Sequence, residues 1–177
     1  AIYVGNSMGG TTCLVQAIEA PERVSKIVLG GSHASTGGDP YIIANFPSEG
    51  SKSTRETYAN PTREQFIRYL KVHLHDEAMA TDPELVDYVF NQWTGAKEHQ
   101  EAQGKSASVS HSNLALLEQI EVPVRIVHGR FDRMVTVEQA LMLMAYMPQA
   151  DLVILNKTGH WAPYERPNDY LNHVLPF

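Results

Sequence analysis

The fold is decided by residues 1–31, which read AIYVGNSMGGTTCLVQAIEAPERVSKIVLGG. The apolar run at residues 2–4 is β-prone and stops at Gly5, which is typical of a buried strand. Small and helix-tolerant residues follow over residues 7–20, with apolar positions spaced as on one helix face. A second apolar run covers residues 24–29 and ends at two glycines. Strand, helix and strand in this order predict a βαβ unit with a parallel sheet.

A second α/β block closes the chain. Residues 123–129 and 152–155 are predicted strands, with a predicted helix at residues 136–147 between them. Residues 165–175 predict a closing helix whose first turn tolerates a proline. The apolar side of the helix before the last strand is predicted to carry Leu141, Met144 and Ala145.

The middle of the chain differs in composition from both blocks. It is richer in Ser, Thr, Gly and His, and two amphipathic helices are predicted there at residues 61–76 and 83–93. We therefore expect three parts: a sheet segment at residues 1–31, a helical lid inserted at residues 32–112, and a second sheet segment at residues 113–177.

Composition excludes several classes of protein. Among 177 residues, 14 are Lys or Arg and 20 are Asp or Glu, a formal net charge of −6, so no basic field gathers nucleic acid or an anionic membrane. Cys13 is the single cysteine, which excludes an internal disulfide. It lies on the inner helix face and is predicted to be a small buried core residue. No long apolar run or leader is present, and we expect a soluble, cytoplasmic protein.

Residues 5–9, Gly-Asn-Ser-Met-Gly, match the pattern G-x-S-x-G between a predicted strand and a predicted helix. In such a turn the residues two before and two after the serine must be small, and the serine hydroxyl is lifted above the sheet. Ser7 is therefore the candidate nucleophile. The backbone N–H of Met8 opens the helix and is the candidate oxyanion donor. The alternative interpretation is an ordinary glycine turn before a helix.

A serine needs a base to accept its proton, and the base needs an acid to orient it. In folds with this turn the chain order is serine, acid, histidine, each after a strand of the sheet. Asp132 follows the predicted strand at residues 123–129, and His160 follows the one at residues 152–155. Ser7, Asp132 and His160 are therefore the candidate catalytic triad. The alternative makes Asp132 a turn residue and His160 a loop histidine.

Other polar residues give weaker signals. The spacing of His73, His75 and Asp76 resembles that of metal ligands. However, side chains two residues apart on a helix point in different directions, so a polar helix end is the preferred interpretation. No metal or organic cofactor is expected. Ser32 follows a strand at the edge where ligands gather, and both a substrate contact and a plain loop role stay open.

Three segments resemble the α/β-hydrolase superfamily and, within it, the meta-cleavage product hydrolases, which split a carbon–carbon bond in 2-hydroxy-6-oxo-dienoates from aromatic-ring degradation. The segments are residues 5–10 (GNSMGG), 128–135 (HGRFDRMV) and 159–165 (GHWAPYE). The resemblance implies the C-terminal part of an α/β-hydrolase fold, with a mostly parallel sheet flanked by helices and an inserted helical lid. It also implies earlier strands and a second oxyanion donor before residue 1, so these residues alone are expected to be nearly inactive and to expose an apolar strand edge.

The resemblance further implies three substrate-binding positions. Asn6 belongs to a polar pocket beside the nucleophile, and Trp161 walls the substrate channel. Val89 stands where the family usually has an arginine that pairs with the substrate carboxylate. This departure keeps a carboxylesterase open beside the carbon–carbon bond hydrolase.

The family reaction leaves one step undecided. After the dienol ketonises, either Ser7 or a water activated by His160 attacks the distal carbonyl. The expected partner is a small-molecule substrate, and a homo-oligomer stays open. A non-catalytic binding protein is the third hypothesis, whereas reactions with a carboxylate nucleophile, haloalkane dehalogenation and epoxide hydrolysis, are disfavoured by Ser7.

Overall fold

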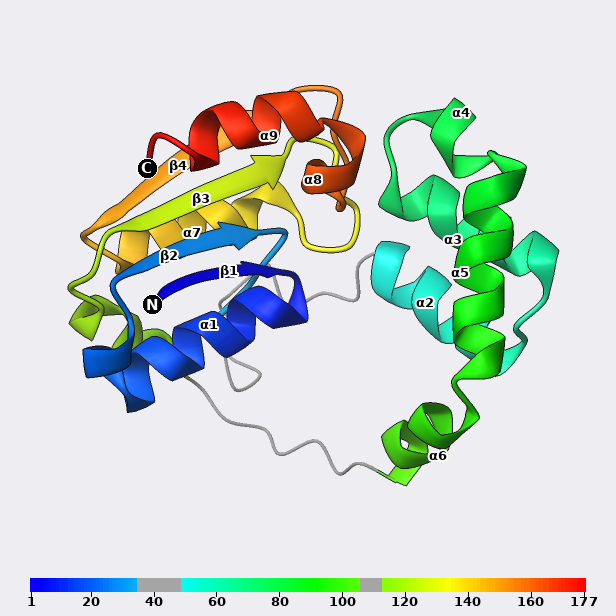
Figure 1. Ribbon diagram of the computed structural model, residues 1–177, viewed down its shortest axis with the longest axis horizontal. Coiled ribbons are helices and arrows are strands. Elements are labelled where there is room, and N and C mark those ends of the chain that lie inside the picture. The colour runs from blue at the N-terminus through cyan, green and yellow to red at the C-terminus, as the bar shows by residue number, and fades with distance from the viewer. Residues whose placement is uncertain (35–48, 106–112) are drawn as a thin grey trace.

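The computed structural model describes residues 1–34, 49–105 and 113–177. Within these residues four strands form one parallel sheet in the order β1-β2-β3-β4 (Figure 1). Asn6 pairs with Gly30 and Gly129 pairs with Leu155, so the carboxyl ends of all four strands meet at one edge of the sheet. The strands are β1 (Ile2–Asn6), β2 (Lys26–Gly30), β3 (Val124–Gly129) and β4 (Ala150–Leu155).

One face of the sheet is covered by α1 (Met8–Glu19), α7 (Val137–Tyr146) and the 3-10 helix η3 (Leu114–Gln119). A further 3-10 turn, η1 (Pro21–Arg23), leads into β2. The predicted apolar side of α7 is wrong for all three of its residues, because Leu141 and Met144 are 44% and 38% exposed and Ala145 is exposed as well. The buried stripe, spaced as one helix face, consists instead of Ala140, Leu143 and Met147.

The opposite face packs on α8 (Ala162–Glu165) and α9 (Pro167–Val174). Val28 points to this face, while its neighbours Ile27 and Leu29 point to the other, as strand alternation requires. The closing helix predicted at residues 165–175 is confirmed as α9, which begins at Pro167, while the short α8 ends just before it at Glu165. Proline fits there because the first helical turn needs no N–H donor.

The first strand is an edge strand, and its burial differs from the expectation. Ile2 and Val4 are 61% and 59% exposed, whereas Tyr3 between them packs against the α1 side. A fully buried strand at residues 2–4 is therefore the wrong prediction. The exposed pair matches the expected apolar strand edge.

Between β2 and β3 the described chain forms helices that lie beside the sheet (Figure 1). The predicted helix at residues 61–76 is confirmed as α3, but it ends at His73 because the chain leaves the helical conformation at Leu74, and the Asp76 side chain caps a separate short helix that follows. The predicted helix at residues 83–93 is confirmed, with Asp82 as its cap. The helices are α2 (Glu49–Ala59), α3 (Arg63–His73), α4 (Glu77–Ala80), α5 (Pro83–Gly95) and α6 (Lys97–Lys105).

The division at residues 1–31, 32–112 and 113–177 stays a prediction. Residues 35–48 and 106–112, which adjoin its inner boundaries, lie outside the described residues. In the described part, no helix combines the length and the apolar character that crossing a membrane requires.

Candidate active site

Ser7 lies in the turn between β1 and α1 with φ 55° and ψ −125°, a conformation that non-glycine residues seldom adopt. Its backbone N–H donates to Gly30 O at 2.8 Å, which ties the turn to β2. A Cβ on Gly5 would stand 2.4 Å from Gly9 O, so only glycine fits at position 5. A Cβ on Gly9 would meet nothing within 4 Å, so an alanine would fit at position 9.

Two residues beside the turn were also candidates. Met8 is the first residue of α1, so its backbone N–H has no acceptor one turn earlier within the helix. Ser32 is 1% exposed, and its hydroxyl donates to Gly30 O at 2.9 Å. A Cβ on Gly10 would come within 1.8 Å of the Ser32 Oγ, so the Ser32 side chain packs directly under the turn.

Asp132 and His160 form a buried pair. The distance from His160 Nδ1 to Asp132 Oδ2 is 2.8 Å, and the residues are 4% and 5% exposed. The other carboxylate oxygen accepts the N–H groups of Met134 and Val135, both at 2.8 Å. Because a carboxylate can only accept, Nδ1 carries the proton in the neutral histidine and Nε2 is left as the basic nitrogen.

Behind this pair lies Gly31, with φ +50°. A Cβ there would stand 2.8 Å from His160 Nδ1 and 3.2 Å from Asp132 Oδ2. Gly31 was predicted only to end a strand. A side chain at position 31 is excluded by residues more than 100 positions away in the sequence. No local sequence pattern could therefore predict this requirement.

The Gly31→Ala change should lower kcat by roughly 100-fold, because displacing a catalytic group by about 1 Å has an effect of that order. The matched control is Gly9→Ala at the same edge, since the added methyl group meets nothing within 4 Å. Steady-state kinetics on the complete protein as its gene encodes it measures the difference. Equal kcat values for both variants would contradict the packing described above.

His128 is a second histidine that lies close to the Asp132 carboxylate. Its side chain is fully buried, its Nε2–H donates to Val135 O at 2.8 Å, and the same nitrogen is 3.5 Å from Asp132 Oδ2. Burial lowers the pKa of His128, which favours the neutral ring. Within the part of the chain that the structure describes, the Asp132 carboxylate is thus held by hydrogen-bond donors and pairs with no Lys or Arg.

His73, at the end of α3, lies next to His160 and is 2% exposed. Its Nδ1–H donates to Tyr69 O at 2.8 Å, and its ring meets the His160 ring edge-on at 5.6 Å between centroids. Burial is the main cause that lowers the pKa of His73 to about 4. His73 does end a helix, as predicted, but it is buried beside His160. In the described residues, no group of three or more His, Cys, Asp or Glu is arranged to hold a metal ion.

This histidine predicts a pH dependence of stability. Between its ordinary pKa of 6.5 and the lowered value of about 4, the unfolded chain binds a proton that the folded chain does not. The contribution to the free energy of unfolding is complete above pH 6.5 and falls as the pH is lowered, by about 3 kcal/mol in all. Urea unfolding at pH 7 and pH 4.5 should show a smaller loss for His73→Phe than for the parent. The exposed control His99→Phe should behave as the parent, and equal losses in all three would contradict this assignment.

The remaining candidates connect the turn, the histidine and the inserted helices. Asn6 Nδ2 donates to His160 O at 3.4 Å, while its buried Oδ1 has no hydrogen-bond partner among residues 1–34, 49–105 and 113–177. Trp161 and Val89 pack against the same apolar cluster of α3, α4 and α5. Among the described residues, no hydrogen bond joins the Ser7 hydroxyl to His160.

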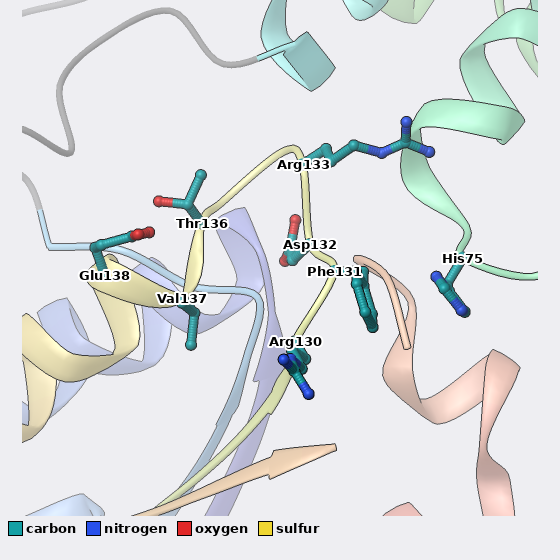
Figure 2. A pocket seen from close by; sticks show the side chains of 8 residues that line it. All are labelled: His75, Arg130, Phe131, Asp132, Arg133, Thr136, Val137 and Glu138. Carbon is teal, nitrogen blue, oxygen red and sulfur yellow. The ribbon is translucent and has the colours of Figure 1, made fainter. Parts of the chain in front are cut away.

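A hollow of about 500 Å³ opens beside the acid loop, residues 130–136, which joins β3 to α7. Figure 2 shows Arg133 reaching from this loop toward the inserted helices and Phe131 lying near His75. The hollow is lined by His75, Arg130, Phe131, Asp132, Arg133, Thr136, Val137 and Glu138.

A parallel sheet with a strained serine after one strand and a buried acid–histidine pair after two others defines the class of folds that carry a nucleophile turn. The family model described as the alpha/beta hydrolase fold matches residues 1–167. The chain belongs to the α/β-hydrolase fold family.

Individual relatives are more specific. A 2-hydroxy-6-oxononadienedioate/2-hydroxy-6-oxononatrienedioate hydrolase of Burkholderia vietnamiensis is 35% identical over 181 residues, covering all of this chain and 62% of the relative. A meta-cleavage product hydrolase of Pseudomonas fluorescens superposes with a TM-score of 0.79 at 24% identity, over 98% of this chain and 62% of that one. A 2-hydroxy-6-oxo-6-phenylhexa-2,4-dienoate hydrolase of Rhodococcus gives 0.66 at 27% identity, over 97% and 63%. The chain thus spans about three fifths of the length of these relatives.

Proposed function

We propose that this chain is the catalytic part of a serine hydrolase that cleaves a carbon–carbon bond in a 2-hydroxy-6-oxo-dienoate. The observation that carries the proposal is the buried Asp132–His160 pair, 2.8 Å apart, at the sheet edge where Ser7 holds its strained turn. The substrate class is supported by relatives of about one-third identity that are named for hydrolysing such compounds.

The proposed chemistry gives each residue of the triad a role, and His160 acts first as a base and then as an acid. Ser7 attacks the distal carbonyl while its proton moves to His160 Nε2, and Asp132 stabilises the imidazolium that forms. The Met8 N–H stabilises the oxyanion. The dienol ketonises before Ser7 attacks. After the attack the carbon–carbon bond breaks, and the departing fragment leaves as an enolate that takes the proton from His160. Water then hydrolyses the acyl-serine.

The proposed compartment is the cytoplasm, and this proposal rests on composition alone. Four further residues are proposed as substrate contacts. Asn6 and Trp161 flank His160, and Val89 lies in the apolar cluster that contacts Trp161. Ser32 is the weakest of the four, because its hydroxyl is used by Gly30. The contacts are Asn6, Ser32, Val89 and Trp161.

Turnover of two substrates by the complete protein tests the proposal. A 2-hydroxy-6-oxo-dienoate should be preferred to a short aryl ester in kcat/KM by at least about tenfold, since specificity is a ratio of these constants. The rival is a carboxylesterase, favoured by the apolar surroundings of Val89, which offers the substrate carboxylate no fork of donors. An ester preference of the same size would establish the rival.

A further inference from the structure

Glu165 is a buried carboxylate that the proposed chemistry does not use. It ends α8, five residues after His160, and is 5% exposed. In the described part of the chain, no Lys, Arg or His forms an ion pair with it. A buried charge without a cation requires other compensation.

The compensation comes from backbone N–H groups of two separate segments. Oε1 accepts the N–H of Gly159 at 2.7 Å, in the histidine loop, residues 156–161. Oε2 accepts the N–H of His75 at 2.7 Å and that of Asp76 at 3.4 Å. The latter two belong to residues 73–76, which comprise the last residue of α3 and the chain that leads to α4 and are called the connector below. One carboxylate therefore bridges the histidine loop and the inserted helices.

A second bond joins the same two segments directly. The N–H of His160 donates to His73 O at 2.6 Å. A Cβ on Gly159 would stand 2.4 Å from His73 O and 3.0 Å from Glu165 Oε1. The backbones at Gly159 and His73 are therefore too close together for any residue other than glycine at position 159. Two consecutive N–H groups of the histidine loop are thus fixed by the connector, one directly and one through Glu165.

The neighbourhood of the connector also holds the acid loop. The His75 ring stacks on Phe131 with centroids 4.4 Å apart, and Arg133 donates to Lys71 O near the end of α3. The loops that carry Asp132 and His160 are therefore both attached to one end of α3.

We propose that Glu165 is a positioning residue that sets the place of His160 by clamping the histidine loop to the connector. Both carboxylate oxygens must accept, and only the ionised acid does so on both sides. In Glu165→Gln, one oxygen becomes an N–H₂ group that faces a backbone N–H. The position of His160 is thereby coupled to the position of the inserted helices. The role of His160 here rests on the proposed function.

The test compares kcat per active site, counted by stoichiometric labelling with a serine-directed phosphonate, in the complete protein. Glu165→Gln should lower kcat per labelled site by roughly 10- to 100-fold, the order expected for a displaced catalytic group, with KM changed much less. The control Glu118→Gln removes an exposed acid and should match the parent. A purely structural role would reduce the number of labelled sites and leave kcat per site intact, which would overturn the proposal.

A second variant guards against a failure to fold. Gly159→Ala forces the same junction apart from the other side, whereas its control Gly95→Ala adds a methyl group that meets nothing within 4 Å. The Gly159 variant should also lose kcat per labelled site, and parent-like values in it would overturn the proposal. If the unchanged protein neither labels nor turns over a substrate, the proposed function fails instead, so the two failures are distinguishable.

Discussion

Replacing Ser7 by alanine should lower kcat of the complete protein by about 10⁶-fold, the loss found when a triad serine is removed from a serine hydrolase. The reason is that the hydroxyl forms the covalent bond and supplies the proton that His160 accepts. The change should cost little stability, because Ser7 is held by its backbone N–H to Gly30 and not by its side chain. Steady-state turnover of the dienoate measures the loss.

The control is Ser25→Ala, which removes an exposed serine just before β2, at the other end of the sheet. It should leave kcat unchanged. A Ser7→Ala enzyme that keeps activity within about tenfold of the parent would contradict the covalent route and favour attack by a water that His160 activates.

Replacing Asp132 by asparagine should lower kcat by about 10⁴-fold. The asparagine oxygen can still accept the N–H groups of Met134 and Val135, so the loop keeps its shape. Its amide N–H₂ then faces His160 Nδ1, which must accept, and the proton moves to Nε2. The ring is left in the tautomer that cannot take the proton of Ser7.

The measurement compares the steady-state kcat of Asp132→Asn with that of the control variant Asp151→Asn. Asp151 is an exposed acid that pairs with Arg125 at 3.3 Å, so its replacement should leave kcat near the parent value. Similar small losses in both variants would show that Asp132 only shapes its loop.

Sequence patterns predict the elements whose periodicity is local. The β1-α1-β2 unit and the β3-α7-β4 unit follow from apolar runs and helical spacing. They place Ser7, Asp132 and His160 after strand ends, and the parallel sheet then gathers those ends at one edge. The exposure of Ile2 and Val4 does not follow from the local apolar pattern, because it depends on which strand lies at the edge of the sheet; only the family resemblance led us to expect it.

The parts that sequence reasoning missed depend on contacts between distant segments. Helix α2 has a largely polar sequence, EGSKSTRETYA, without a clear apolar stripe. Gly31, His73 and Glu165 gain their significance only when three separate segments meet around His160. The sequence drew attention to His73 only for a metal-ligand spacing and to Glu165 only as the end of a family segment, and neither pattern indicates contacts around His160.

The central claim is that Ser7 is a nucleophile activated by His160 and Asp132. Its most direct test is to treat the complete protein with a serine-directed phosphonate and locate the adduct by peptide mass spectrometry. We predict one adduct per chain, on Ser7, that is absent in Ser7→Ala and strongly slowed in Asp132→Asn. An active protein that takes no adduct, or one that carries it on another residue, would contradict the account.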